Sequence, residues 1–579
     1  MDYKEIYESW LNNPYIDEAT KEELRSISGD EQEIKERFYM DLEFGTAGLR
    51  GIIGAGTNRM NPYVVRKATQ GLANYIKGVG KESQGVAIAF DSRRMSPEFA
   101  QEAALCLAAN GIKAYIFESL RPTPELSFAV RKLGCVAGIN ITASHNPPEY
   151  NGYKVYWEDG AQITPPHDSG IMAEVKAISE YSEATMKTMD KDAAVAAGLY
   201  QVIGQAIDDA YMEELKSQVL HMDAIQETAK ELKIVYTPLH GTGNIPARRV
   251  LKELGFENVY VVKEQELPDG NFPTVSYPNP EAAEAFELGL KLAQEVDADL
   301  VLATDPDADR LGVRVKDKNG EYHDLTGNMS GCLLANYEIE QRKALKGLPE
   351  DGALIKTIVT TNMADAIAKY YGVKVIEVLT GFKWIGQQIL GFENSGKGTY
   401  LFGFEESYGC LIGTHARDKD AIVATMALCE AAAYYKTQGK TLWDAMIDMY
   451  EKYGYYKDAI KTVTLKGIEG LAKIQEVMNN LRENPPKKIG DYQVLSFRDY
   501  KKDTITDLAT GEVKATGLPN SNVLYFDLND DAWVCARPSG TEPKLKFYYG
   551  IKGTSLEDAD QRSAALGDQV LAIINEMLA

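Results

Sequence analysis

Histidine, closely spaced cysteines and long apolar runs are all scarce in this chain of 579 residues. It contains 6 His and 6 Cys, and no two of the cysteines form a CxxC motif. A metal centre built from several histidine or cysteine ligands therefore has little to draw on. Most of the cysteines lie in apolar segments, which is typical of buried free thiols in a reducing compartment.

The sequence lacks apolar segments of the kind that membranes and export require. No run approaches the roughly 18 apolar residues that a membrane-spanning helix needs. The opening segment, MDYKEIYESWLNNPYIDEAT, has no apolar core of a signal peptide. We therefore expect a cytoplasmic protein that has no membrane partner.

Positive charge is in short supply. Lys and Arg number 62 against 85 Asp and Glu, which gives a formal net charge of −23. Duplex nucleic acids and anionic membrane surfaces bind basic surfaces, so we expect no nucleic-acid partner. Small anionic substrates are not excluded, because a local basic pocket can lie within an acidic surface.

Several folded domains are expected from the length and composition. A chain of 579 residues predicts about four domains. Its 44% hydrophobic and 25% charged residues are ordinary for a folded protein.

One order of elements, an apolar strand, helix, strand, helix and strand, occurs three times. The first copy runs from the apolar segment 85–90 to 136–142, the second from 233–236 to 299–303, and the third from 353–359 to 398–402. Strands that alternate with helices predict mostly parallel sheets covered by helices. Ligands bind beyond the carboxyl ends of such strands. The loops that follow the third strand of each copy are therefore the candidate functional segments.

The end of the chain has a different pattern. Beyond about residue 455 the sequence predicts scattered strands, a helix over 467–483, a hairpin over 522–536 and a closing helix from Ser555. We predict an α/β fold of three similar domains with mixed sheets covered by helices, followed by a C-terminal α+β domain. The expected boundaries are 1–205, which includes a helical segment over 1–40, then 206–325, 326–455 and 456–579.

Asp305, Asp307 and Asp309 alternate in the loop of the second copy. In an extended backbone they would project to one side and could share a hard cation. An EF-hand is excluded, because Arg310 and Lys316 stand where its glycine and glutamate are needed. A solvated acidic turn is the alternative, and the apolar strand before the loop argues against it. With only a few carboxylates on offer, Mg²⁺ is the expected metal.

Ser144 lies in the equivalent loop of the first copy, within Thr142-Ala-Ser-His145-Asn-Pro. No G-x-S-x-G motif surrounds it, so the nucleophile elbow of a hydrolase is excluded. A serine after a strand is most often a turn residue. The loop that holds Ser144 is equivalent to the Asp loop of the second copy, however, and this favours a catalytic role for Ser144. His145 could act as a base or as a local hydrogen-bond partner.

Two further loops alternate polar side chains. Arg537, Ser539 and Thr541 would offer a guanidinium and two hydroxyls on one face, which suits a phosphate dianion. The alternative is an ordinary polar hairpin end. Glu405 and Ser407 alternate in the loop of the third copy and could grip adjacent sugar hydroxyls.

Together these motifs resemble those of the α-D-phosphohexomutase superfamily, and in particular its long phosphoglucomutase branch with bacterial and phosphopentomutase-like members. The resemblance spans about residues 40–550 and is carried by four segments in family order. These are Thr142–Lys154, Asp305–Arg310, Gly403–Ser407 and Arg537–Thr541.

The resemblance implies four domains around a central cleft and assigns roles to single residues. Ser144 would carry a phosphoryl group, and Asp305, Asp307, Asp309 and a phosphoserine oxygen would hold Mg²⁺. Lys154 matches a proton-transfer position, while Arg50 and Arg310 would offset charge on the transferring group. The implied substrate-binding residues are Thr46, Arg50, Arg310, Thr380, Lys383, Glu405, Ser407, Lys419, Arg537, Ser539, Thr541 and Lys546.

The implied activity is that of a Mg-dependent isomerase. It would interconvert α-D-glucose 1-phosphate and glucose 6-phosphate through glucose 1,6-bisphosphate, which would also act as activator. Phosphopentomutase, phosphomannomutase and glucose 1,6-bisphosphate synthase activities are alternatives on the same scaffold. A metal-dependent phosphatase and a non-catalytic sugar-phosphate sensor are alternatives of other classes. Small sugar phosphates are the expected partners, and the chain is expected to be a monomer or dimer.

Overall fold

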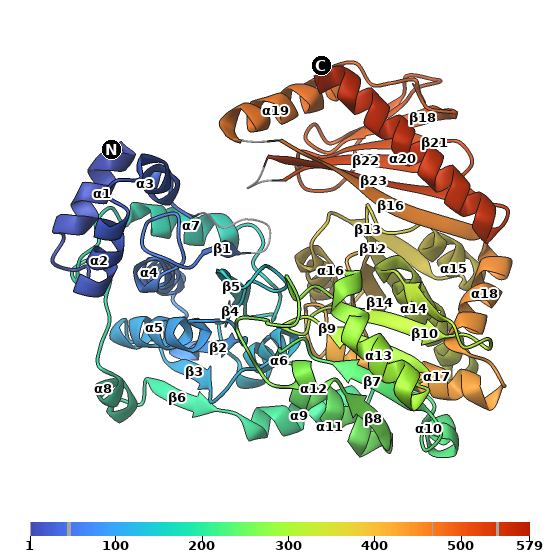
Figure 1. Cartoon of the computed structure of the whole chain (residues 1–579), viewed down its shortest axis with the longest axis horizontal. Coiled ribbons are helices and arrows are strands. Elements are labelled where there is room, and N and C mark those ends of the chain that lie inside the picture. Colours follow the sequence, from blue (N-terminus) through green and yellow to red (C-terminus); the bar gives the residue numbers. More distant parts are fainter. Residues whose placement is uncertain (1, 43–47, 466, 540–542, 579) are drawn as a thin grey trace. The chain divides into compact units, whose positions relative to one another are not determined.

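The computed structural model describes residues 2–42, 48–465, 467–539 and 543–578 (Figure 1). The chain divides into two compact units. The first comprises residues 1–327, 382–402 and 407–442, and the second comprises 328–381, 403–406 and 443–579.

The chain begins with three short helices, as expected over residues 1–40. Each has an aspartate at its N-cap, Asp2, Asp17 or Asp30, whose side chain accepts a backbone N–H of the first turn. Trp10 and Phe38 pack edge to face, with their ring centroids 5.6 Å apart. The helices are α1 (Tyr3–Asn12), α2 (Glu18–Ser26) and α3 (Glu31–Phe38).

The first sheet has the order β1-β5-β4-β2-β3-β6. Its central strands β2, β3 and β4 are parallel, and β5 runs antiparallel to β4. Helices α5 and α6 pack against β2 and β4. The strands are β1 (Leu49–Ile52), β2 (Val86–Phe90), β3 (Ala114–Phe117), β4 (Ala137–Ile141), β5 (Tyr150–Trp157) and β6 (Tyr200–Ile203). The helices are α4 (Pro62–Gly78), α5 (Ser96–Ala109), α6 (Thr123–Leu133), α7 (His167–Ala177) and α8 (Lys191–Ala196), with a 3₁₀ turn over Glu82–Gln84.

The second sheet has the order β11-β10-β9-β7-β8, with β10 antiparallel to β9. No helix begins at Pro280–Glu281; a 3₁₀ turn over Ala283–Phe286 comes first, and α13 begins at Glu287. The Asn279 side chain accepts the Glu281 N–H at 3.0 Å and fixes a turn there, which delays the helix. The strands are β7 (Lys233–Thr237), β8 (Asn258–Val261), β9 (Leu300–Thr304), β10 (Leu311–Lys316) and β11 (Tyr322–Leu325). The helices are α9 (Gln205–Lys216), α10 (Met222–Thr228), α11 (Asn244–Leu254), α12 (Lys263–Glu266) and α13 (Glu287–Val296).

The third sheet, with the order β13-β12-β14-β15, repeats the arrangement of the other two. In each sheet the first strand of the sequence repeat lies between the second and third strands, and a return strand flanks the third. The strands are β12 (Gly352–Thr357), β13 (Lys374–Val378), β14 (Thr399–Glu405) and β15 (Gly409–Leu411). The helices are α14 (Gly327–Lys346), α15 (Met363–Tyr371), α16 (Phe382–Ser395), α17 (Ala421–Thr437) and α18 (Leu442–Tyr453). The predicted threefold α/β repeat is therefore confirmed.

The C-terminal region is an antiparallel sheet with the order β16-β23-β22-β21-β18-β19-β20, and α19 and α20 pack against it. The predicted hairpin is present, and Asp530 and Asp531 at its turn have φ angles of 60° and 58°. The strands are β16 (Tyr455–Thr464), β17 (Lys488–Ile489), β18 (Tyr492–Asp499), β19 (Thr504–Asp507), β20 (Val513–Lys514), β21 (Leu524–Leu528), β22 (Trp533–Pro538) and β23 (Lys544–Gly553). The helices are α19 (Gly467–Glu483) and α20 (Leu556–Leu578).

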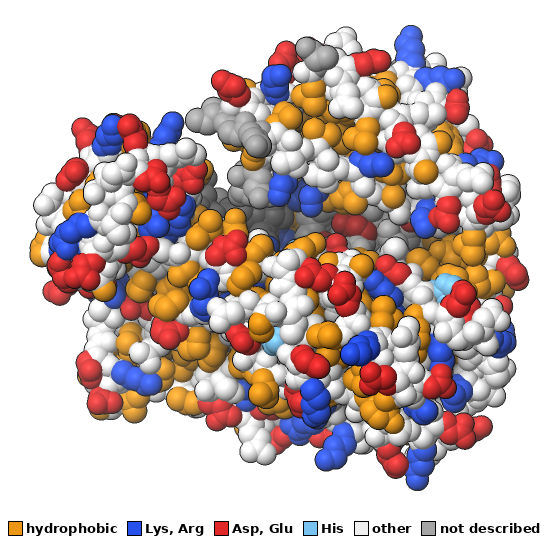
Figure 2. Space-filling model, viewed as in Figure 1, with side chains coloured by type: hydrophobic (Ala, Val, Ile, Leu, Met, Phe, Trp, Pro, Cys, Tyr) orange, Lys and Arg blue, Asp and Glu red, His pale blue; other side chains and the backbone are white. Residues whose placement is uncertain are grey.

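The burial of the cysteines and the charged surface agree with what the composition predicts. All six cysteines are buried free thiols, as expected. Acidic and basic side chains are interspersed over the face shown in Figure 2. Within the described ranges, no helix combines the length and the apolar character needed to cross a bilayer.

Candidate active site

Ser144 lies in a sharp turn between β4 and β5. Its side chain is buried, its φ angle is 51°, and its N–H donates to Thr142 Oγ1 at 2.8 Å. Non-glycine residues in this left-handed region are uncommon and cluster at functional sites. Gly152 on β5 permits the close approach, because a Cβ there would lie 2.4 Å from the Thr142 carbonyl oxygen. The turn thus presents the Ser144 hydroxyl at the carboxyl end of β4.

The Asp loop follows β9 in the equivalent place of the second sheet. Asp305, Asp307 and Asp309 are buried, and each offers an oxygen that lies within 4.8 Å of the others. The expectation of an extended backbone is wrong. Ala308 has a φ angle of 49°, and its N–H donates to the Asp305 carbonyl oxygen at 2.9 Å. A tight turn, rather than the period of a strand, brings the carboxylates together.

The serine loop and the Asp loop meet directly. Ser144 Oγ donates to Asp305 Oδ2 at 2.7 Å. Thr123, at the start of α6, donates from Oγ1 to Asp307 Oδ2 at 2.8 Å and from its N–H to the Asp307 carbonyl oxygen at 2.9 Å. Asn140 Nδ2 in turn donates to Thr123 Oγ1 at 2.7 Å. The first two α/β regions therefore share one buried polar centre.

Two lysines from distant parts of the sequence reach the same carboxylates. Lys154 Nζ on β5 lies 2.8 Å from Asp307 Oδ2 and 3.6 Å from Asp309 Oδ2. Lys419 Nζ, from the loop before α17, lies 3.2 Å from Asp309 Oδ2. Lys419 also pairs with Asp418 at 3.0 Å. The centre thus combines clustered negative charge with cations that could face an incoming phosphate.

The three aspartates fit a hard divalent cation. Asp307 Oδ1 and Asp309 Oδ1 are buried and accept no hydrogen bond from the described residues. Burial raises the pKa of the Asp305 carboxyl well above its usual range, and the charges of Asp307 and Asp309 raise it further. Burial would also raise the pKa of Asp307, but the Lys154 ammonium holds it below its usual value. Orphaned buried carboxylate oxygens are costly, and an oxygen-seeking cation would satisfy them.

His145, Arg50 and Arg310 surround this centre. His145 Nδ1 lies 3.2 Å from Ser144 Oγ. Burial lowers the pKa of His145 well below its usual value, and the charges of Arg310 and Arg50 lower it further. The imidazole is therefore neutral at pH 7, which suits both the base and the hydrogen-bond role. Arg50 on β1 donates to Asn146 Oδ1 at 3.0 Å, and Arg310 pairs with Glu281 at 2.8 Å.

The remaining predicted residues divide between the two units. In the first unit, Lys383 is the second residue of α16. Ser407 precedes Tyr408, whose carbonyl oxygen accepts the Leu311 N–H next to the Asp loop. In the second unit, Glu405 Oε1 accepts the Gly381 N–H at 2.8 Å, beside Thr380. Arg537 and Lys546 are register partners on β22 and β23, and the Ser539 N–H donates to the Lys544 carbonyl oxygen at 2.8 Å. Thr46 and Thr541 lie outside the described residues.

Sequence reasoning missed several buried partners of the centre. Thr123 stands in Arg121-Pro-Thr-Pro124 at the end of the second strand, and this polar, proline-rich strand end was the available signal. Asp418 and Tyr156 gave no such signal. Their hydrogen bond, from the Tyr156 hydroxyl to Asp418 Oδ2 at 2.8 Å, joins residues 262 positions apart.

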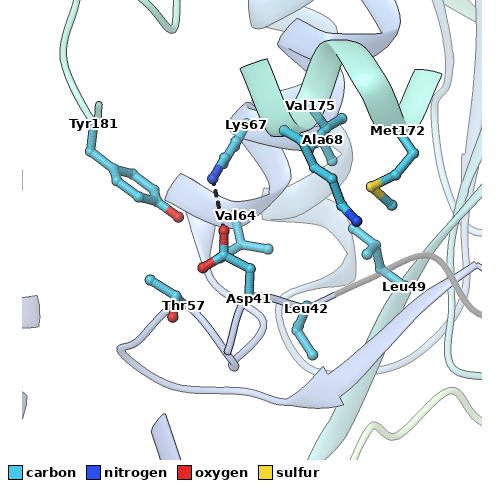
Figure 3. Close-up of a pocket in the computed structure, with 11 residues that line it drawn as sticks. Asp41, Leu42, Leu49, Thr57, Val64, Lys67, Ala68, Met172, Val175 and Tyr181 are labelled. Atoms are coloured by element: carbon cyan, nitrogen blue, oxygen red, sulfur yellow. Dashed lines mark hydrogen bonds and ion pairs between the residues drawn. The ribbon is translucent and has the colours of Figure 1, made fainter. Parts of the chain in front are cut away.

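A cavity of about 150 Å³ lies between α4, α7 and β1, apart from this centre (Figure 3). Apolar side chains such as Leu49 and Val175 line it, and the Lys67–Asp41 ion pair, 2.9 Å long, borders it. Successive side chains of a strand point to opposite faces. Leu49 therefore faces the cavity while its neighbour Arg50 faces the Ser144 loop.

Comparison with known proteins identifies the family. Models of the phosphoglucomutase/phosphomannomutase α/β/α domains I, II and III match residues 41–182, 209–320 and 326–453. The phosphoglucomutase of Staphylococcus aureus (strain MSSA476) is 36% identical over 557 residues, which cover 95% of this chain and 97% of that protein.

Solved structures share the fold. The open form of parafusin, a phosphoglucomutase from Paramecium, has a TM-score of 0.67 at 18% identity and covers 93% of this chain and 95% of its own. The Aspergillus fumigatus N-acetylphosphoglucosamine mutase, solved with GlcNAc-6P and magnesium, has a TM-score of 0.51 at 13% identity and covers 92% of this chain and 96% of its own. With 36% identity to a curated phosphoglucomutase over nearly its whole length, the chain belongs to the α-D-phosphohexomutase superfamily of isomerases.

Proposed function

We propose that the chain is a phosphoglucomutase that interconverts α-D-glucose 1-phosphate and glucose 6-phosphate. The observation that carries the proposal is the contact between Ser144 Oγ and Asp305 Oδ2, at 2.7 Å, inside a buried cluster of three aspartates. A hydroxyl held against candidate metal ligands suits a phosphoryl carrier. The 36% identity to a phosphoglucomutase supports glucose phosphates as the substrates.

In the proposed reaction, Ser144 carries the phosphoryl group as a phosphoserine. The bond between Ser144 Oγ and phosphorus breaks while a bond forms between phosphorus and the free hydroxyl of the sugar phosphate. The product is glucose 1,6-bisphosphate, which turns over and returns its other phosphoryl group to Ser144. Added bisphosphate would act as an activator, because it phosphorylates any enzyme that has lost its phosphate.

Mg²⁺ is the cation we propose for Asp305, Asp307 and Asp309, with a phosphoserine oxygen as a further ligand. When bound, it would neutralise charge on the transferring phosphoryl group. Two orphaned carboxylate oxygens in the cluster support this role, as does the magnesium of the Aspergillus mutase.

Basic groups of the chain would handle charge and protons around the transferring group. Lys154 on β5 lies beside the aspartates. Its proposed role is to exchange a proton with the sugar hydroxyl that reacts. Arg50 and Arg310 would offset phosphoryl charge, and Lys419 would contact the ligand beside Asp309. His145 would accept a hydrogen bond near Ser144 in its neutral form.

The sugar and its second phosphate would be held by the remaining residues. Glu405 and Ser407 would bind sugar hydroxyls, together with Thr380 and Lys383. The proposed residues for the phosphate that does not react are Arg537, Ser539, Thr541 and Lys546, and Thr46 is a further proposed contact. Because all six cysteines are free thiols, we place the enzyme in the reducing cytoplasm.

A substrate panel tests the proposal. The purified chain is assayed with glucose, mannose, glucosamine and pentose 1-phosphates in the presence of Mg²⁺ and trace glucose 1,6-bisphosphate. The highest kcat/KM is expected for glucose 1-phosphate. A higher value for a pentose or mannose phosphate would reassign the substrate, and release of inorganic phosphate at the turnover rate would show a phosphatase instead.

A further inference from the structure

We infer that Arg93 is a positioning residue that fixes the Ser144 loop for phosphoryl transfer, an inference that rests on the proposed function. Arg93 lies in the loop after β2, 51 positions from Ser144 in the sequence. Its side chain is fully buried, at 1% exposure. A charged side chain is seldom buried to this degree unless its donors are paired.

The guanidinium of Arg93 donates to four backbone carbonyl oxygens of one loop. Nη2 donates to the carbonyl oxygens of Ser144, at 2.6 Å, and Asn146. Nη1 donates to those of Pro147, at 2.8 Å, and Tyr150, at 3.0 Å. The whole turn from Ser144 to the start of β5 is therefore gathered around one planar group.

The backbone of this turn needs such a group. Ser144 has a φ angle of 51°, and Ser144, Asn146 and Pro147 lie in the turn between β4 and β5, outside the hydrogen-bonded ladders of these strands. Buried carbonyl oxygens without donors destabilise a loop. Arginine offers five donors in a rigid fork, whereas the three donors of a lysine diverge from one atom. Only the fork matches several oxygens at once.

Arg93 itself is held from two sides. Asp91, the residue directly after β2, accepts the Arg93 N–H at 2.9 Å and pairs with Arg93 Nε at 3.4 Å. From the second α/β region, the Phe272 ring lies 5.1 Å from Arg93 Cζ. Gly270 lies so close that a Cβ would be 2.5 Å from the Arg94 nitrogen. The guanidinium therefore has one defined place, with an ion pair on one side and an aromatic face on another.

Arg93 would affect the reaction through the position of the Ser144 loop. The carbonyl that Arg93 holds belongs to the residue whose Oγ contacts Asp305, so a shift of the loop moves the phosphoryl carrier away from the aspartates. Misplacement by about 1 Å can reduce a reaction rate about 100-fold. Arg93 is not among the groups proposed to touch the sugar, so the KM for glucose 1-phosphate should change little.

The test compares Arg93→Lys with Arg94→Ala, a change at the exposed neighbour whose Nη2 donates to the Pro148 carbonyl oxygen at 3.2 Å. We measure kcat, KM and, by intact mass, the single-turnover rate at which glucose 1,6-bisphosphate phosphorylates Ser144. For Arg93→Lys, kcat and the phosphorylation rate should both fall about 100-fold at an unchanged KM. Arg94→Ala should retain the wild-type values.

Several outcomes would overturn the inference. One is a kcat for Arg93→Lys that equals the wild-type value. Another is a smaller fraction of enzyme that can be phosphorylated, if this fraction accounts for the whole loss of kcat. The third is an equal loss of kcat in Arg94→Ala. If Arg93→Lys does not fold, Phe272→Leu decides the matter, because it leaves the guanidinium in place and removes its aromatic support. A fall of about five-fold in the phosphorylation rate is then expected, and an unchanged rate refutes the inference. A wild-type chain that takes no phosphate on Ser144 would instead refute the proposed function.

Discussion

The hydroxyl of Tyr156 donates to Asp418 Oδ2 at 2.8 Å, and both side chains are buried. Tyr156 stands two residues after Lys154, on the same face of β5. Asp418 stands directly before Lys419 and pairs with its ammonium at 3.0 Å. This hydrogen bond therefore ties together the two segments whose lysines reach Asp309.

Replacing Tyr156 with phenylalanine should lower kcat about ten-fold. The change removes the hydrogen bond to Asp418 and leaves its oxygen unpaired, so the loop that carries Lys419 is no longer held against β5. Tyr153→Phe is the matched control. It removes a buried hydroxyl from the same strand, whose partner is Thr69 Oγ1 at 3.0 Å. Steady-state kinetics check the difference, and equal rates for the two variants would show that the Tyr156 contact has no role in catalysis.

Ser144→Ala should reduce mutase turnover to background and leave the thermal transition within a degree or so of the wild type. The change removes one hydroxyl, whose net hydrogen-bond contribution to stability is about 1 kcal/mol, but it deletes the proposed phosphoryl carrier. Intact mass after incubation with glucose 1,6-bisphosphate should show one added phosphate on the wild type and none on the variant. Phosphate on another residue, with activity retained, would contradict the assignment.

Mg²⁺ should stabilise the protein as well as activate it. At about 100 times its Kd, a cation that binds only the folded state adds about 2.7 kcal/mol. Thermal melts with and without the metal should show a rise in Tm for the wild type. The rise should be lost in Asp307→Asn and kept in Asp297→Asn, whose side chain is 81% exposed. A full response in Asp307→Asn would exclude that carboxylate as a ligand.

Arg537→Ala should lower kcat/KM about 30- to 150-fold. Losing a charge-assisted contact to phosphate is worth about 2–3 kcal/mol when the contact is shielded from water. Ser144 should still become phosphorylated by bisphosphate, because Arg537 is proposed to hold the phosphate that does not react and takes no part in the bond that forms at Ser144. Bisphosphate that leaves the enzyme during turnover is trapped and measured. Normal substrate affinity in the variant would count against a phosphate role.

The stability of the second unit should depend on Asp458. Burial raises the pKa of Asp458 to about 6, above the value near 3.9 expected in the unfolded chain. The folded state then retains a proton that the unfolded state loses, so this group's contribution is fully present below about pH 4 and is lost as the pH rises through about 6. Its size is about 2–3 kcal/mol.

Asp458→Asn should remove this pH dependence. Urea unfolding at pH 4.5 and pH 7.5 should show the variant gaining stability relative to the wild type at the higher pH. Asp568→Asn, a change at a carboxylate that is 77% exposed, is the control and should follow the wild type at both values. Parallel curves for wild type and Asp458→Asn would show that the carboxyl titrates normally.

The sequence by itself determined the threefold repeat and the places of the loops that are proposed to carry the chemistry. Strands and helices are encoded by local periodicity, and the loops that hold Ser144 and Asp305 occur at equivalent strand ends, so their equivalence could be predicted from spacing alone. The turn at Asn529-Asp-Asp531 was predicted from the preference of such residues for turns.

Only the tertiary structure decided how those loops are completed. The left-handed turn at Ala308 replaced the extended backbone that the alternating aspartates suggested, because a backbone that takes its hydrogen bonds within the loop need not keep the period of a strand. Thr123 on Asp307, Asp418 on Tyr156 and Arg93 on the Ser144 loop join residues that are remote in the chain. Such contacts depend on how buried donors find acceptors once the sheets are packed, and no local pattern of residues specifies that pairing.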